Sequence, residues 1–248
     1  MKIAWIGTGV MGKPMALHLV DAGYEVTAYN RTFEKAKVLE PKVKAVESIE
    51  ACVKDADVIF SIVGYPSDVQ EVYQTVMEHA KKGAICVDMT TSSPTLAIAL
   101  EKEAKTRGLI MLDAPVTGGD IGAINATLSI MVGGDQKAFD TILPLFNKMG
   151  KTITYMGGPG SGQHAKLANQ TAIAGAISGI AEALTYAKAK GLDQTDMLKV
   201  ITGGSASSWL TRLGVKPGIR EGCYRASWEA ASLAWPARCE GPWTPSRG

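Results

Sequence analysis

The segment from Gly7 to Gly12 is the first candidate for chemistry in this sequence. It reads Gly-Thr-Gly-Val-Met-Gly, follows a short apolar run and precedes apolar residues at helical spacing. In this context the glycines permit a tight turn, a close approach of the backbone to a pyrophosphate, and close packing of helix on strand. The helix start adds free N–H groups and a positive dipole end. The pattern predicts a dinucleotide site, with a glycine-rich structural turn as the alternative. The residues of this expected site are Gly7, Thr8, Gly9, Val10, Met11 and Gly12.

The tripeptide Asn30-Arg31-Thr32, about twenty residues further on, indicates which dinucleotide binds. NAD-dependent enzymes place a carboxylate here for the ribose hydroxyls, and that carboxylate would repel a 2′-phosphate. Asn30 is neutral, and Arg31 offers a guanidinium that binds phosphate in a bidentate way. Thr32 adds a hydroxyl and is expected to cap the next helix, and Lys35 adds positive charge one turn along. We expect NADP(H) to be preferred and NAD(H) to be possible; the alternative is that Arg31 and Lys35 are only solvated.

Two further segments follow expected strands, at the ends that line a cofactor cleft in parallel sheets. The first consists of Val63, Gly64, Tyr65 and Pro66. The second runs from Thr90 to Ser92 and includes Thr91. Either segment is also explained as a plain loop or a helix cap, because Ser92 or Ser93 before Pro94 is suited to cap a helix.

Two groups of polar residues are candidates for anion binding and for catalysis, respectively. Thr117, Gly118 and Gly119 offer a hydroxyl and two unencumbered N–H groups, as an anion-binding nest does, although a simple turn explains them equally well. Lys166 and Asn169 lie three residues apart on an expected helix and therefore share a face. A lysine on a helix is otherwise usually solvated.

The elements that must position these residues alternate between strand and helix. Strands are expected over residues 2–7, 25–29, 58–63, 84–87, 109–113, 128–132 and 151–155. Helices are expected over residues 10–22, 32–39, 67–79, 94–106 and 136–146. This alternation predicts an α/β fold with a Rossmann-type, doubly wound and mostly parallel sheet.

The character of the sequence changes after residue 160. Residues 161–190 have no strand pattern and are rich in Ala, Gly and Ser, which predicts one long, tightly packed helix, followed by a shorter helix over 194–201. We therefore expect an NADP-binding Rossmann domain over 1–160 and the start of an all-helical second domain over 161–210.

A second change comes at residue 211. Residues 1–210 contain eighteen Lys and two Arg, whereas residues 211–248 contain one Lys and five Arg. One evolved domain rarely changes its basic residue so abruptly. The tail over 211–248 is expected to be either disordered or divergent, or else translated out of the original reading frame or otherwise foreign.

Composition excludes several classes of function. The net charge of +2 over 248 residues does not favour nucleic acid. No apolar run reaches the roughly 18 residues of a membrane span, and the start of the chain lacks the uninterrupted apolar core of a signal peptide. The four cysteines, Cys52, Cys86, Cys223 and Cys239, have no metal-binding spacing. We expect a cytoplasmic protein with reduced thiols, no bound metal and no membrane partner.

These motifs, in this order, resemble the β-hydroxyacid dehydrogenase family, the group of 3-hydroxyisobutyrate dehydrogenase and the glyoxylate and succinic semialdehyde reductases. The resemblance covers residues 1–210. The matching segments are GTGVMGKPMA, NRT, VGYP, DMTTSSP, DAPVTGG and GSGQHAKLANQ. Imine reductases share the glycine motif and an NRT-like segment, but they resemble this chain less because they typically lack a lysine at position 166.

The resemblance implies hydride transfer between NADP(H) and a small 3-hydroxy acid, aldehyde acid or keto acid. It implies that Lys166 is the general acid and base, that Asn169 orients the substrate, and that the segment Thr117 to Gly119 holds the substrate carboxylate. Many relatives have a second Asn where this chain has Gln170, and the family usually forms homo-oligomers through its helical domain. A closing Lys-Asp segment of the family is not found here, so the alternative function is an NADP-binding fragment with impaired catalysis.

Overall fold

The computed structural model describes residues 1–207 of the chain, which divide into two compact units. The first unit is Met1–Lys166, and the second begins at Leu167. The boundary between the units lies inside a helix rather than in a linker. The tail expected over 211–248 lies outside the described residues, as do Cys223 and Cys239.

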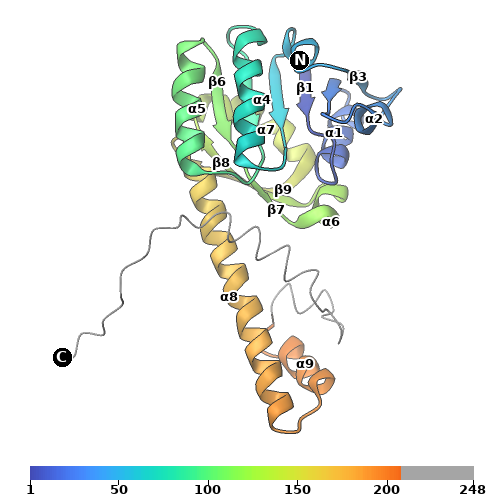
Figure 1. The fold of residues 1–248 in the computed structure, drawn as a ribbon, viewed down its shortest axis with the longest axis vertical. Coiled ribbons are helices and arrows are strands. Elements are labelled where there is room, and N and C mark those ends of the chain that lie inside the picture. Colours follow the sequence, from blue (N-terminus) through green and yellow to red (C-terminus); the bar gives the residue numbers. More distant parts are fainter. Residues whose placement is uncertain (208–248) are drawn as a thin grey trace, which may run out of the picture. The chain divides into compact units, whose positions relative to one another are not determined.

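The described part of the first unit contains one sheet of nine strands (Figure 1). The strands are β1 (Lys2–Ile6), β2 (Glu25–Tyr29), β3 (Lys44–Val46), β4 (Val58–Ser61), β5 (Ile85–Asp88), β6 (Ile110–Asp113), β7 (Val116–Thr117), β8 (Leu128–Gly134) and β9 (Gly150–Gly157). Their order begins β3-β2-β1-β4-β5-β6, and these six strands are parallel. β8 is antiparallel to β6 and β7, whereas β9 is parallel to β8. The order is that of a doubly wound nucleotide-binding sheet, which confirms the expected fold class.

Helices cover both faces of this sheet (Figure 1). They are α1 (Gly12–Asp21), α2 (Glu34–Lys37), α3 (Ile49–Val53), α4 (Pro66–His79), α5 (Pro94–Thr106), α6 (Gly119–Ile124) and α7 (Gln136–Met149). Successive strand residues point to opposite faces, so Trp5 of β1 packs in the cluster formed with α1 and α7. Its neighbours Ala4 and Ile6 pack in the cluster formed with α3, α4 and α5. The sheet is therefore buried on both faces, as its continuous apolar strands require.

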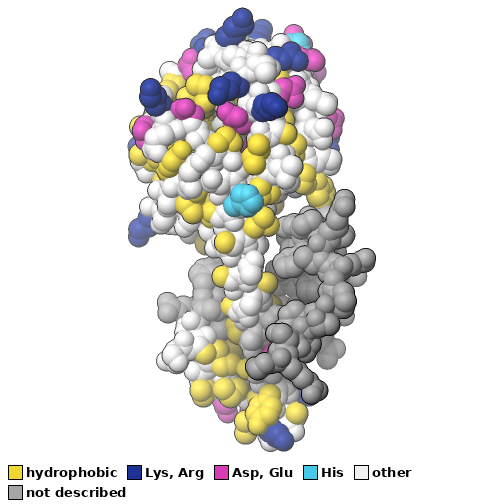
Figure 2. Space-filling view, turned by 90° about the vertical axis from the view of Figure 1, so that its left-hand side faces the viewer, with side chains coloured by type: hydrophobic (Ala, Val, Ile, Leu, Met, Phe, Trp, Pro, Cys, Tyr) yellow, Lys and Arg dark blue, Asp and Glu magenta, His cyan; other side chains and the backbone are white. Residues whose placement is uncertain are grey.

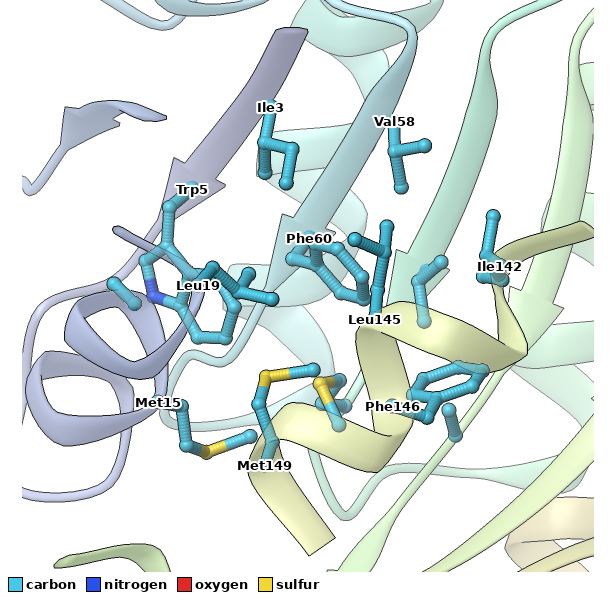
Figure 3. Close-up of a cluster of buried hydrophobic side chains, with 14 of the residues drawn as sticks. Ile3, Trp5, Met15, Leu19, Val58, Phe60, Ile142, Leu145, Phe146 and Met149 are labelled. Carbon is cyan, nitrogen blue, oxygen red and sulfur yellow. The ribbon is translucent and has the colours of Figure 1, made fainter. Parts of the chain in front are cut away.

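Three aromatic rings mark the centre of the larger cluster (Figure 3). Phe60 of β4 stacks on Trp5 with ring centroids 5.4 Å apart, and it meets the edge of Phe146 at 6.1 Å. All three side chains are fully buried. These contacts join β1, β4 and α7, which are far apart in the sequence.

The strands expected from the sequence are all present, with ends within two residues of those observed. Four elements were not expected: β3, α3, β7 and α6. Each has between two and six residues, which is too short to show a periodic pattern.

The sequence predicts two helix caps, and the structure confirms one of them. Of the two serines expected to cap α5, it is Ser93 that does so, by accepting a hydrogen bond from the Leu96 N–H. The expected cap by Thr32 is wrong, because α2 begins at Glu34 with Phe33 in the capping position and no side-chain cap. The carbonyl of Thr32 instead accepts hydrogen bonds from the Asn30 side chain and from the Lys35 N–H.

The second unit is helical over its described residues. Helix α8 (Ser161–Ala189) starts in the first unit and continues into the second, where α9 (Gln194–Gly203) follows. Both helices were expected from the sequence. Between Lys166 and Lys188 only Glu182 is charged, and the α8 segment drawn in Figure 2 is correspondingly pale and yellow. Within the described residues, no helix has both the length and the apolarity needed to cross a bilayer.

Replacing Phe60 with alanine is expected to lower the free energy of unfolding by about 3–5 kcal/mol, the usual range for truncating a buried phenylalanine. The reason is that its ring fills the space between Trp5 and Phe146. The control is Ile121→Ala on α6. Ile121 is 53% exposed, and the expected change in the free energy of unfolding is within about 0.5 kcal/mol. Urea unfolding measures both variants. Equal losses in the two variants would contradict the assignment of Phe60 to the core.

Candidate active site

A cleft of about 400 Å³ lies at the carboxyl ends of β1, β2 and β4. The chain passes from β1 to β2 on one side and reaches β4 on the other, so the cleft lies where the strand order reverses. Doubly wound sheets bind their ligands at this point. Among the residues that line the cleft are these expected cofactor residues: Gly7, Gly9, Val10, Met11, Gly12, Asn30, Arg31, Thr32, Lys35, Val63 and Gly64.

The three glycines of the first turn lie in three different environments. Gly7 has a φ of +97°, and a Cβ there would collide with the carbonyl oxygen of Ile62. A Cβ on Gly12 would collide with the carbonyl oxygen of Gly7. A Cβ on Gly9 would meet no atom within 4 Å. Gly7 and Gly12 therefore allow the strand, turn and helix to pack, whereas Gly9 leaves open space beside the helix start.

Asn30 ties the glycine turn to the end of β2. Its side-chain oxygen accepts a hydrogen bond from the Thr8 N–H at 3.0 Å, and its amide nitrogen donates to the Thr32 carbonyl at 3.0 Å. The Thr8 hydroxyl is buried, and no hydrogen-bond partner for it is found within residues 1–207. The open space beside Gly9, at the start of the helix, fits the phosphate oxygens of a dinucleotide.

Arg31 meets a carboxylate that the sequence analysis missed. Its Nη1 atom lies 3.2 Å from Oδ1 of Asp68, which also lines the cleft. The side chain of Arg31 is 81% exposed, and that of Asp68 is 22% exposed. Oδ2 of Asp68 accepts a hydrogen bond from the Tyr65 N–H at 2.9 Å. An acidic residue in the first turn of a helix after a cleft-lining strand is the signal that would have found it.

Four of the expected cofactor residues are not among those that line the cleft. Thr8, which belongs to the glycine turn, is buried. Tyr65 is largely exposed in the N-cap position of α4, and Pro66 is the first residue of that helix. Thr91 is exposed in the loop after β5. The segment from Val63 to Pro66 thus combines a cleft wall with a helix cap, the two roles that were left open.

A network of buried polar groups holds the loops that follow β4 and β5. Oδ1 of Asp88, at the end of β5, accepts hydrogen bonds from the Ser61 hydroxyl and the Thr90 N–H. The Thr90 hydroxyl accepts a hydrogen bond from the Val63 N–H at 3.0 Å. Burial raises the pKa of Asp88 to about 6, and its hydrogen bonds oppose that rise. Asp88 therefore holds the β4 loop in position through Thr90.

The start of α8 is held by a second buried carboxylate, Asp113 of β6. Its two oxygens accept hydrogen bonds from the N–H groups of Gly160 and Gln163, each at 2.8 Å. The side chain of Gln163 donates to the Thr90 carbonyl at 2.8 Å and accepts from the Ser92 N–H at 2.9 Å. Burial raises the pKa of Asp113, and the backbone N–H groups oppose that rise. The first turn of α8 is thus anchored at the ends of β5 and β6.

Lys166 lies in the second turn of this anchored helix. It is only 7% exposed, and desolvation by burial lowers the pKa of its amine to about 8. Asn169 follows on the same helix in the second unit, where its amide nitrogen lies 3.3 Å from the side-chain oxygen of Gln170. A buried lysine with this pKa is suited to exchange a proton near neutral pH.

The segment expected to hold a carboxylate lies at the join of β7 and α6. Thr117 is paired with Ser129 of β8, and Gly118 and Gly119 have φ values of +132° and +65°. A Cβ on Gly119 would meet no atom within 4 Å. These residues, with Lys166 and Asn169, are not among those that line the cleft.

Two family models match the chain. One is described as the NAD binding domain of 6-phosphogluconate dehydrogenase and matches residues 2–157. The other is described as the NAD-binding segment of NADP-dependent 3-hydroxyisobutyrate dehydrogenase and matches residues 160–231.

Several proteins are similar to the chain over most of its length. The Bacillus subtilis oxidoreductase YkwC is 50% identical over 84% of this chain and 73% of its own length. The 2-hydroxy-3-oxopropionate reductase of Escherichia coli is 38% identical over 84% of this chain and 72% of its own length. The NAD-dependent L-serine dehydrogenase of Pseudomonas aeruginosa is 34% identical over 89% and 76%.

Solved structures are similar as well. Mycobacterium tuberculosis 3-hydroxyisobutyrate dehydrogenase with L-serine has a TM-score of 0.82 and 30% identity, and the match covers 93% of this chain and 85% of that one. Psf3 in complex with NADP+ and 2-OPP has a TM-score of 0.81 and 26% identity, covering 99% and 89%.

The different environments of Gly9 and Gly12 predict different effects of an added methyl group. Gly12→Ala is expected to lower the free energy of unfolding by about 1–3 kcal/mol, because the methyl group collides with the Gly7 carbonyl. Gly9→Ala is expected to leave stability within about 0.5 kcal/mol and to weaken NADPH binding about tenfold or more, by occupying the space beside the helix start. Urea unfolding and calorimetric titration test the pair. Normal NADPH binding by Gly9→Ala would contradict the pyrophosphate assignment.

Proposed function

The chain belongs to the β-hydroxyacid dehydrogenase family, and we propose that it transfers a hydride between NADP(H) and a small carboxylate-bearing substrate. It is an NAD(P)-dependent hydroxyacid dehydrogenase or reductase. The proposed substrate is a 3-hydroxy acid, aldehyde acid or keto acid of the 3-hydroxyisobutyrate, succinic semialdehyde or glyoxylate type. The family matches at 2–157 and 160–231 favour this over an impaired cofactor-binding fragment.

The observation that carries the proposal is the burial of Lys166 on an anchored helix. A lysine that is 7% exposed pays a desolvation penalty for its charge, which brings its pKa to about 8. Asp113 and Gln163 hold the preceding turn through three hydrogen bonds to the ends of β5 and β6. A lysine that only faces solvent would be neither buried nor placed on a helix turn held by buried hydrogen bonds.

A bound nicotinamide would supply the hydride in reduction and accept it in oxidation, and Lys166 supplies or accepts the proton at the substrate oxygen. In the reducing direction its ammonium group donates a proton to the oxygen of the carbonyl. In the oxidising direction its neutral amine accepts the proton of the alcohol. With a pKa of about 8, Lys166 has both forms available near neutral pH.

The substrate carboxylate is assigned to Thr117, Gly118 and Gly119, with Asn169 orienting the substrate. The open space beside Gly119 and its positive φ support this assignment, because they leave the backbone accessible to an anion. The names of two relatives, a 2-hydroxy-3-oxopropionate reductase and an L-serine dehydrogenase, both specify small carboxylate-bearing substrates.

The preference for NADP(H) rests on Arg31 and Lys35 at the edge of the cleft, where no acid occupies position 30. The Psf3 structure contains NADP+, which supports the preference. The relative from Pseudomonas aeruginosa is NAD-dependent, so the coenzyme varies within the group.

Replacing Arg31 with alanine tests the coenzyme preference. NADPH binding is expected to weaken by about 1.5–3 kcal/mol, the contribution of a charge-assisted hydrogen bond, whereas NADH binding is expected to change little. Lys37→Ala is the control, because it removes an equal charge on α2 from a residue that is not among those lining the cleft. Calorimetry with both coenzymes measures the effect. An equal loss for NADPH and NADH would overturn the assignment.

Replacing Lys166 with alanine tests the proton transfer. Turnover of NADPH with succinic semialdehyde or glyoxylate is expected to fall about 10²–10⁴-fold, with NADPH binding nearly unchanged. Lys166→Met serves as a folding control, since an apolar side chain removes the cost of burying a charge. Near-normal turnover in both variants would show that Lys166 is not the acid or base.

The pKa of Lys166 also predicts opposite pH profiles in the two directions. In reduction the protonated amine is needed, so kcat is expected to fall as the pH rises through about 8. In oxidation the neutral amine is needed, so kcat is expected to rise through the same pH. Steady-state rates from pH 6 to 10 measure both limbs. Profiles that move in the same direction would contradict the role.

A further inference from the structure

We infer that Asp68 is a specificity-determining residue of the cleft, because it competes with the 2′-phosphate of NADPH for the guanidinium of Arg31. Asp68 thereby limits the preference for NADPH over NADH. The inference rests on the proposed coenzyme assignment and adds a carboxylate to it. Neither the glycine motif nor the Asn30-Arg31-Thr32 segment contains this group.

The carboxylate of Asp68 is fixed more firmly than the guanidinium it faces. Oδ2 accepts the Tyr65 N–H at 2.9 Å, and the same oxygen lies 2.7 Å from the position that a Cβ on Gly64 would occupy. Only 22% of the Asp68 side chain is exposed, against 81% for Arg31. Because Asp68 is held by the backbone at the start of α4, the Arg31 side chain is the partner that can turn away.

The charges along this part of the cleft balance one another. Arg31 and Lys35 contribute two positive charges, and Asp68 and Glu71 contribute two negative charges, all four from residues that line the cleft. A 2′-phosphate needs a surplus of positive charge, whereas a ribose hydroxyl does not. The balance therefore disfavours NADPH more than it disfavours NADH.

The contact between Arg31 and Asp68 leaves binding of NADPH possible. The ion pair uses Nη1 of Arg31 at 3.2 Å, and a guanidinium has five N–H donors in all. While Nη1 stays on Asp68, the phosphate has fewer of these donors than a guanidinium without this contact would offer it. Asp68 consequently lowers the affinity for NADPH without abolishing it, and a hydroxyl of NADH can use the same carboxylate as an acceptor.

Asp68→Asn in the full chain is the direct test. The asparagine side-chain oxygen can still accept the Tyr65 N–H, so the cap of α4 is kept while the negative charge is removed. NADPH is expected to bind about 5- to 10-fold more tightly, the size expected for two charges a few ångströms apart in an exposed cleft. NADH is expected to bind equally well or more weakly. The gain for NADPH is expected to shrink in about 0.5 M salt, because exposed charges are screened there.

Two controls separate the role of Asp68 from a general change in charge. Asp21→Asn makes the same change at an exposed ion pair with Lys42, outside the residues that line the cleft, and is expected to leave both affinities unchanged. Unfolding in urea reports whether Asp68→Asn has damaged α4. A stable Asp68→Asn variant that binds NADPH no better, or that gains equally for NADPH and NADH, overturns the inference.

The double variant Arg31→Ala with Asp68→Asn distinguishes this inference from the proposed preference itself. If the two groups compete as inferred, the gain caused by Asp68→Asn disappears when Arg31 is absent. A gain that persists without Arg31 overturns the competition. The proposed preference is tested separately by Arg31→Ala alone, which must weaken NADPH relative to NADH whatever Asp68 does.

Discussion

The position of the helix that carries Lys166 depends on the hydrogen bonds accepted by the buried carboxylate of Asp113. It lies at the end of β6, where its oxygens accept the N–H groups of Gly160 and Gln163 at the start of α8. The helix can approach this closely because residue 162 is a glycine: a Cβ there would be 2.5 Å from the carbonyl oxygens of both Asp113 and Met131. Moving this turn would move Lys166, which follows one turn later. Burial of a carboxylate is unfavourable by itself, so these backbone donors are needed to stabilise it.

The same principle operates one strand away, at Asp88. The register of β5 and β6 places Asp88 beside Asp113, and each of the two carboxylates organises a different loop. Asp88 acts through Thr90 on the cofactor cleft, and Asp113 acts directly on α8. Gln163 joins the two systems, since its side chain binds the Thr90 carbonyl and the Ser92 N–H. The cleft loops and the start of the lysine-bearing helix are therefore positioned by one connected set of buried and partly buried hydrogen bonds.

The cleft itself divides into a part set by the backbone and a part set by side chains. Around Gly7 and Gly12 the chain segments are so close that no side chain fits, so this part is shaped by backbone packing and not by charged side chains. Around Arg31 and Asp68 the cleft is exposed and contains charges of both signs. Exposed charged residues in the second part can therefore change without disturbing the packing of β1 on α1.

What the sequence by itself determined are the features encoded over short distances. The glycine turn, the Asn30-Arg31-Thr32 segment, the alternation of strands and helices, and the long helix α8 all follow from residue spacing within one element or turn. The position of Lys166 on a helix also follows from spacing. The cap assigned to Thr32 was wrong because a long-range hydrogen bond holds that loop. Asn30 accepts the Thr8 N–H and donates to the Thr32 carbonyl.

Only the tertiary structure decided which distant residues support and modify the site. Asp68 lies 37 residues from Arg31, and Gln163 lies 73 residues from Thr90. No local pattern indicates either pairing, because the carboxyl ends of strands far apart in the sequence meet at one edge of the sheet only after folding. The pKa of Lys166 was equally hidden, since burial is what lowers it and burial is a property of the packed chain.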